Sequence, residues 1–159
     1  MTYFARYEEP ASGFATVAGR DDGLHRIVLA AGRLGAVEGG PIHLHHGEEI
    51  LRILSGEVDV TVGHETRRCG AGDVVIVPTD TPHGFTTITE TAMEVVAELD
   101  AGQVFPVPAR DGTTRLVEVY RSDMPWSRQP PHGFRWTSDA EMADILSRAS
   151  EGIAANQSG

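Results

Sequence analysis

Alternation of apolar and polar residues dominates the middle of the chain. In residues 57–62, valine occupies every second position, and Glu57, Asp59 and Thr61 stand between the valines. Because the side chains of a strand point alternately to its two faces, this spacing predicts a strand with one buried face. Comparable patterns predict further strands over residues 24–30, 49–54 and 92–99, and one that begins at His83, and a short apolar run predicts another strand over 74–77.

Glycine and proline mark the ends of these segments. Gly56 separates the strands 49–54 and 57–62, and it is expected to take the positive φ of a tight hairpin. The segment 74–77 is apolar at every position, as expected of a strand between two layers, and Pro78 ends its hydrogen bonding.

The charge balance argues against several classes of function. The formal net charge is -10 at pH 7, and every basic residue is arginine. Such acidity repels phosphate backbones and anionic lipid surfaces, so neither nucleic acid nor membrane is an expected partner. The absence of lysine excludes lysine-base chemistry within this chain. Cys69 is the only cysteine, which excludes an intrachain disulfide. With no signal-peptide pattern and no apolar run long enough to span a bilayer, we expect a soluble cytoplasmic protein.

Histidines and a carboxylate gather around these central strands. His43 and His45 are two residues apart, so in a strand their rings leave the same face. Glu49 follows after a short bend, and a buried carboxylate needs a partner or a cation. His83 comes directly after a proline-rich corner. Three imidazole nitrogens and one carboxylate oxygen suit a divalent first-row metal, and they leave two positions open if the ion is six-coordinate.

The run His43-x-His45-x3-Glu49-x6-Gly56, followed by Gly72-x5-Pro78-x-Asp80-x2-His83, resembles the two paired motifs of the cupin superfamily. The resemblance implies an all-β fold, a jelly-roll-like double-stranded β-helix barrel of two antiparallel sheets with the metal inside. It also implies that the metal ligands are His43, His45, Glu49 and His83. Three positions depart from the motifs: Val37 and Asp80 stand where glycine is usual, and Thr87 where asparagine is common.

The ligand set leaves the identity of the metal open. Fe, Mn, Ni, Co, Cu and Zn all accept imidazole and carboxylate ligands. His46 and Glu48 are alternative ligands, and His46 in particular could replace Glu49, although alternation turns it away from the face of His45. Phe85 shares the strand face of His83 and is the expected pocket wall. No second histidine or carboxylate stands out as a general base.

A length of 159 residues is typical of one domain. The last part of the chain contains Ser138-Asp-Ala-Glu141, a capping-box pattern that predicts a helix packed on the barrel. In the loop before it, Pro131-His-Gly-Phe134 echoes the sequence at His83; we interpret the echo as chance, the alternative being that His132 or Trp126 caps the cavity. We expect a single cupin domain over 1–150, made of an N-terminal arm 1–23 with a short strand at 14–18, a barrel core 24–101, an additional strand 113–121 and a C-terminal helix 138–149, followed by a mobile tail 151–159.

For function, the resemblance implies a mononuclear divalent-metal cupin enzyme that acts on a small oxygenated organic molecule. A dioxygenase-type oxidoreductase is the leading hypothesis, and a non-redox isomerase, lyase or polyketide-cyclase-like enzyme is the alternative. A non-catalytic small-ligand-binding cupin is the hypothesis from a different class. Small cupin barrels have exposed sheet edges that commonly pair, so a homodimer is expected.

Overall fold

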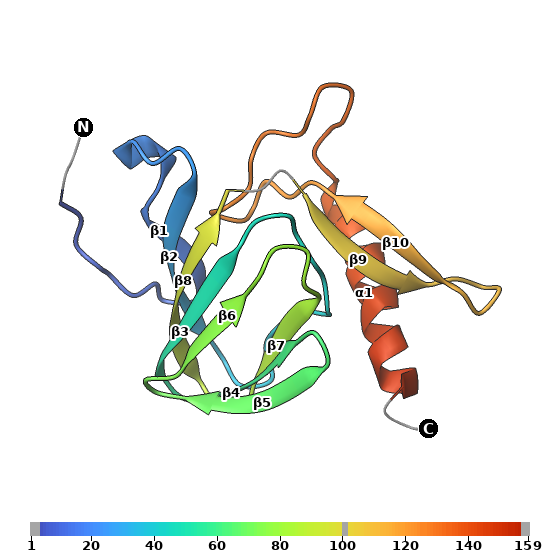
Figure 1. Ribbon diagram of the computed structural model, residues 1–159, viewed down its shortest axis with the longest axis horizontal. Coiled ribbons are helices and arrows are strands. Elements are labelled where there is room, and N and C mark those ends of the chain that lie inside the picture. Colours follow the sequence, from blue (N-terminus) through green and yellow to red (C-terminus); the bar gives the residue numbers. More distant parts are fainter. Residues whose placement is uncertain (1–3, 100–101, 157–159) are drawn as a thin grey trace.

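The computed structural model describes residues 4–99 and 102–156, with side chains as far as Glu151. Two antiparallel sheets form a barrel, and a smaller sheet and a helix lie beside it (Figure 1). The first sheet has the strand order β1 (Gly13–Ala18), β2 (Ile27–Leu34), β8 (Thr91–Glu98), β3 (Glu49–Ser55) and β6 (Val74–Val77). The second has the order β5 (Glu65–Gly70), β4 (Glu57–Val62) and β7 (His83–Thr87). The predicted fold class is confirmed.

The barrel core is filled by the residues that alternation predicted to point inward. On β4, Val58 and Val60 are buried, whereas Asp59 between them is half-buried. On β8, Met93 and Val95 are each 1% exposed. Full burial of one such side chain contributes about 1.5–3 kcal/mol, so the two inward faces supply much of the stability of the barrel.

The connection between β3 and β4 passes from one sheet to the other. β3 pairs with β8 and β6, whereas β4 pairs with β5 and β7. Gly56 has the predicted positive φ, +82°. The predicted hairpin is wrong, because alternation within two strands carries no information on which strands pair.

β6 is an edge strand of the first sheet, and the prediction that it lies between two layers is wrong. Val77 is buried, but Val74 and Ile76 are 55% and 69% exposed. Ile50, the partner of Ile76 on β3, is 42% exposed, so the apolar outer surface continues onto the next strand. A short apolar run is compatible with either burial on both faces or an apolar outer face, and periodicity alone does not separate them.

β2 begins later than predicted and extends to Leu34. A 3-10 helix η1 (Arg20–Asp22) and Gly23, with φ +91°, turn the chain before the strand starts. His25 lies in this turn region and is exposed. β1, which the sequence placed at residues 14–18, pairs with β2 at the edge of the sheet.

The last part of the chain forms a second apolar cluster beside the barrel. β9 (Gln103–Pro108), expected only as an extended segment, pairs with β10 (Thr114–Val119), and α1 (Asp139–Asn156) packs on β9. The helix therefore covers this hairpin and not the barrel core, as Figure 1 shows. The buried residues of the cluster are Phe105, Val107, Val119, Met142, Ile145 and Ala149.

The start of α1 is the predicted capping box. The Ser138 amide donates to Oε2 of Glu141 at 2.8 Å, and the Glu141 amide donates to the Ser138 hydroxyl at 3.3 Å. The helix continues to Asn156, past the predicted end at 149 and through most of the segment expected as a mobile tail; residues 157–159 lie outside the described residues.

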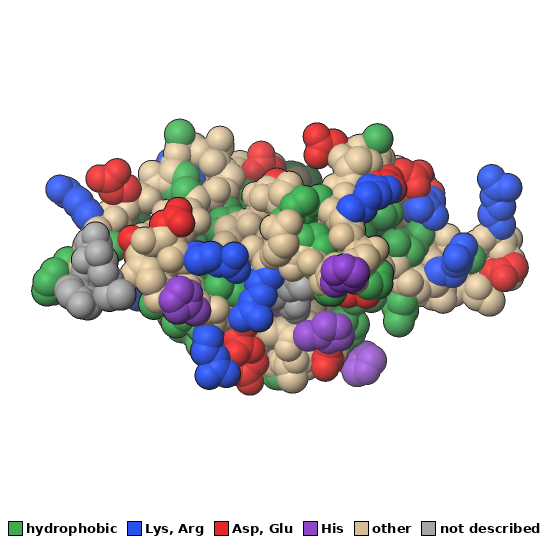
Figure 2. Space-filling model, turned by 90° about the horizontal axis from the view of Figure 1, so that it is seen from above, with side chains coloured by type: hydrophobic (Ala, Val, Ile, Leu, Met, Phe, Trp, Pro, Cys, Tyr) green, Lys and Arg blue, Asp and Glu red, His purple; other side chains and the backbone are tan. Residues whose placement is uncertain are grey.

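Arginine and acidic side chains are intermixed on the face of the molecule shown in Figure 2. Over the surface of the described residues, several arginine and acidic side chains are paired, for example Arg68 with Asp59 and Arg135 with Glu141. Within the described residues, none of the helices combines the length and apolarity needed to span a bilayer.

Candidate metal centre

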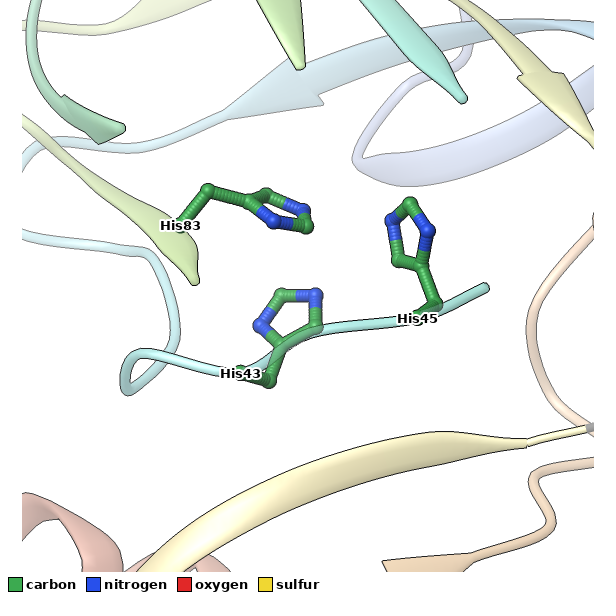
Figure 3. A group of neighbouring side chains, drawn as sticks. All are labelled: His43, His45 and His83. Atoms are coloured by element: carbon green, nitrogen blue, oxygen red, sulfur yellow. The ribbon is translucent and has the colours of Figure 1, made fainter. Parts of the chain in front are cut away.

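Three histidines that are distant in the sequence or on different segments come together in the structure. One ring nitrogen each from His43, His45 and His83 lies within 4.8 Å of the other two, and the rings face a common centre (Figure 3). His83 is the first residue of β7, whereas His43 and His45 lie in an extended segment between β2 and β3. That segment is not a regular strand: His43 and His83 exchange backbone hydrogen bonds of 3.0 and 2.8 Å, and this single bridge brings the two motifs together.

Backbone carbonyl oxygens orient all three rings. Nδ1 of His43 donates to the carbonyl of Pro41 at 3.2 Å, and Nδ1 of His83 donates to that of Thr81 at 2.8 Å. In His45, Nδ1 donates to the carbonyl of Gly47 at 2.7 Å. In a neutral ring, a proton on Nδ1 leaves a lone pair on Nε2, which is the arrangement that metal-bound histidines have.

The environment keeps His43 and His83 neutral. Burial lowers the pKa of His43 from 6.5 to about 4, and the neighbouring His83 adds to the effect. Burial also lowers the pKa of His83, although the nearby Glu49 opposes it. Nε2 of His83 is buried and makes no hydrogen bond within the described part of the chain. A buried nitrogen lone pair that accepts no hydrogen bond can instead coordinate a metal ion.

Glu49 borders the histidine group and is 7% exposed. Its Oε2 lies 3.4 Å from Nε2 of His45, and its Oε1 lies 3.9 Å from Nε2 of His83. Burial raises the pKa of this carboxyl, but the contact with His45 and the charges of the histidines outweigh that and lower it. A carboxylate oxygen beside buried imidazole nitrogens is a ligand set that a divalent ion prefers, so the residues present fit such an ion.

The alternative ligands lie elsewhere. His46 is 64% exposed and its Nδ1 pairs with Asp80. Glu48 is exposed, and its amide donates to Glu98. Neither side chain belongs to the three-histidine group.

His43 and His83 line a cavity of about 690 Å³, and His45 lines a small void of about 10 Å³. The wall of the cavity includes barrel residues such as Phe85. The other side of the wall is formed by Phe105 of β9, by Trp126 in the loop before α1, and by Leu146 of α1. His132 is exposed. The sequence motifs end at His83, so they do not indicate that residues of α1 and β9 line the cavity. The C-terminal helix, which the sequence predicts only as a packing element, also lines the cavity.

The metal-free protein should lose stability as the pH falls from 6.5 towards 4. In this window the unfolded chain binds a proton at His43 that the folded chain does not, so protonation favours unfolding. The pKa of Glu49 is lowered in the folded state, so protonation of this carboxyl below its usual pKa of 4.5 also reduces the stability of the folded protein. His43 keeps part of its surface exposed, so its contribution should be about 2 kcal/mol.

Urea unfolding of metal-free protein at several pH values measures this effect. His43→Gln should flatten the dependence, whereas His64→Gln, at an exposed turn position, should leave it unchanged. An equal slope in all three proteins would contradict the assignment to His43.

Comparison with known proteins places these residues within a matched domain. The family model of the cupin domain matches residues 33–101, which include all three histidines and Glu49. The protein is similar to two solved structures: an RmlC-like cupin from Shewanella frigidimarina (TM-score 0.50, 20% identity, covering 65% of this chain and 84% of that one) and KdgF from Halomonas sp. (TM-score 0.50, 19% identity, covering 60% and 87%). Both likenesses concern the fold alone.

A curated relative has higher identity over a shorter stretch. Dimethylsulfoniopropionate lyase DddQ of Ruegeria pomeroyi is 38% identical over 72 residues, which are 43% of this chain and 36% of the relative. The chain thus spans little more than a third of the length of the curated relative it matches.

Proposed function

This chain belongs to the cupin superfamily, and on that premise we propose that it is a metal-dependent enzyme acting on a small oxygenated organic molecule. The observation that carries the proposal is the convergence of three imidazoles whose Nδ1 atoms are already committed to backbone carbonyls. His43 and His83 line the 690 Å³ cavity, and with each Nδ1 bonded to a carbonyl, the Nε2 atoms are the ring nitrogens that would bind an ion.

In this proposal His43, His45 and His83 hold one divalent ion, and Glu49 completes the ligand set. When bound, the ion would supply Lewis acidity towards an oxygen atom of the substrate. The carbonyls behind the rings keep each Nε2 unprotonated and aimed at the centre. Phe85 and Phe105 line the adjoining cavity and would exclude water around a bound organic molecule.

Among reaction classes, we propose lyase chemistry. The similarity to DddQ, a lyase by name, favours this alternative over the dioxygenase that the sequence resemblance favoured first. Elimination consumes no oxidant, so any ion that provides Lewis acidity would support it, including redox-inert Zn(II). The dioxygenase, the homodimer and the cytoplasmic location stay predictions.

Metal-loaded protein tests both parts of the proposal. We expect about one ion per chain by elemental analysis after loading with Zn(II) or Fe(II). With dimethylsulfoniopropionate and related β-substituted carboxylates, we expect product release with either metal and no oxygen consumption. Oxygen consumption with Fe(II) alone would favour the dioxygenase instead, and protein that retains neither metal would contradict the metal-dependent enzyme itself.

A further inference from the structure

A second polar group of side chains lies in the same cavity, outside the metal centre. Gln103, Arg121 and Trp126 line the main cavity, and all three also line a small adjoining void of about 10 Å³ that reaches His45. We call these three residues the Arg121 cluster. They come from the start of β9 and from the segment after β10, so none of them belongs to the cupin motifs.

Two members of the Arg121 cluster carry buried polar atoms that have no hydrogen-bond partner among the described residues. Gln103 is 7% exposed, and its Oε1 makes no hydrogen bond within the described residues. The same holds for the indole Nε1 of Trp126. The Trp126 ring is held in place by an edge contact with Phe14, at 5.5 Å between centroids and 75° between planes. Buried polar atoms without partners are rare and costly, so two in one place indicate a ligand or a water that they receive.

Arg121 supplies the charge of the cluster. Its side chain is 15% exposed, and its Nε and Nη2 bind Asp123 at 3.0 and 2.7 Å. Asp123 is 62% exposed, so it anchors the guanidinium from the surface side. A guanidinium has five N–H donors, and this pair leaves Nη1 for another acceptor. The small void is also lined by Glu98, whose carboxylate accepts a hydrogen bond from the Glu48 amide.

We infer that the Arg121 cluster binds a carboxylate of the substrate, so that the substrate is a small bifunctional acid with a second oxygen group at the histidines. This inference rests on the proposed function. The guanidinium and the indole N–H are donors, whereas an ionised carboxylate only accepts. Oε1 of Gln103 is an acceptor, so it would receive a water or a donor group of the substrate and not the carboxylate. A phosphate, with about two negative charges at pH 7, would need more cation than one arginine already shared with an aspartate.

Calorimetric titration of Zn(II)-loaded protein tests the inference with two matched pairs, succinate against butyrate and glutarate against valerate. Within each pair the carbon number is equal, and only one member has a second carboxylate. We expect at least one dicarboxylate to bind about 10-fold more tightly than its partner, which is the effect of one charge-assisted hydrogen bond. Equal affinities within both pairs would overturn the inference.

Variants locate the effect. Arg121→Met should remove the preference, and Trp126→Phe, which keeps the ring and deletes the donor, should reduce it. Arg115→Met alters the net charge equally at an exposed position of β10 and should preserve it. A preference that survives both cluster variants would mean that the cluster holds only water. The zinc content of each protein is measured beforehand, so failure to bind zinc, which would contradict the proposed function, is detected separately. If the protein binds no zinc, the cluster is tested by comparing butyrate binding of the wild type with that of Arg121→Met, which should lose it.

Discussion

Replacing His83 with alanine is expected to lower the affinity for Zn(II) by about 100-fold or more, since altering even the groups that support a ligand typically costs 10–100-fold. The variant deletes one of three converging imidazoles, and the remaining two lie on a single chain segment. Binding stabilises the folded state in proportion to the logarithm of ligand excess, so the thermal shift on adding zinc should also largely disappear. Competition with a chromophoric chelator measures the affinity, and elemental analysis measures the occupancy.

His46→Ala is the matched control for that experiment. His46 adjoins the first motif but is 64% exposed and paired with Asp80, so its removal should leave zinc affinity unchanged. Circular dichroism of both metal-free variants separates loss of a ligand from loss of the fold. Full zinc occupancy in His83→Ala would end the three-histidine assignment, and loss of zinc in His46→Ala alone would move the ligand to His46.

The residues that turn the chain illustrate what the sequence could and could not predict. Val37 and Asp80 stand where the motif usually has glycine, and both have left-handed backbones, with φ of 61° and 56°. Aspartate tolerates this region, whereas a β-branched valine is strained in it. The turn geometry is therefore retained without the glycine, because surrounding contacts, such as the bond from the Asp80 amide to the His45 carbonyl, hold the chain.

Thr87, the third departure, also has a structural explanation. Its side chain is fully buried, and its hydroxyl bonds the carbonyl of Gly35 at 2.6 Å and the amide of Glu38 at 2.9 Å. These hydrogen bonds connect the loop after β2 to the end of β7, and the partner Gly35 is 52 residues away in the sequence. Motif spacing identifies such a position, but only the packed structure identifies its partner.

The cavity was predictable on its barrel side and, beyond the barrel, only at Trp126, which the sequence offered as an alternative cap and which lines the cavity. Phe85 follows His83 in register, so alternation was enough to propose it as a wall residue. Gln103, Arg121 and Trp126 reach the same cavity because β9 bridges to Leu44 through Val104 and because the chain after β10 folds back over the barrel. These long-range contacts leave no periodic signal in the sequence.

Gly56→Ala is expected to be far more destabilising than the same change at Gly63, although both glycines have positive φ, +82° and +60°. An alanine in the left-handed region costs about 1–2 kcal/mol at either position. At Gly63 the new methyl meets nothing within 4 Å, so that cost should be the whole effect. At Gly56 the methyl would lie 2.2 Å from the carbonyl oxygen of Glu90 and 2.8 Å from Cα of Thr91, so the backbone entering β8 must move.

We therefore expect a loss of about 3 kcal/mol or more for Gly56→Ala, from the left-handed backbone and the displaced strand together. The free energy of unfolding, from urea titrations of both variants and the wild type, measures the difference. Because Gly56 carries the chain from one sheet to the other and Thr91 begins the strand that pairs with β3, the excess over Gly63→Ala reports how rigidly the two sheets are joined. Equal losses at the two sites would show that the start of β8 yields easily, and that the crossover does not set the relation between the sheets.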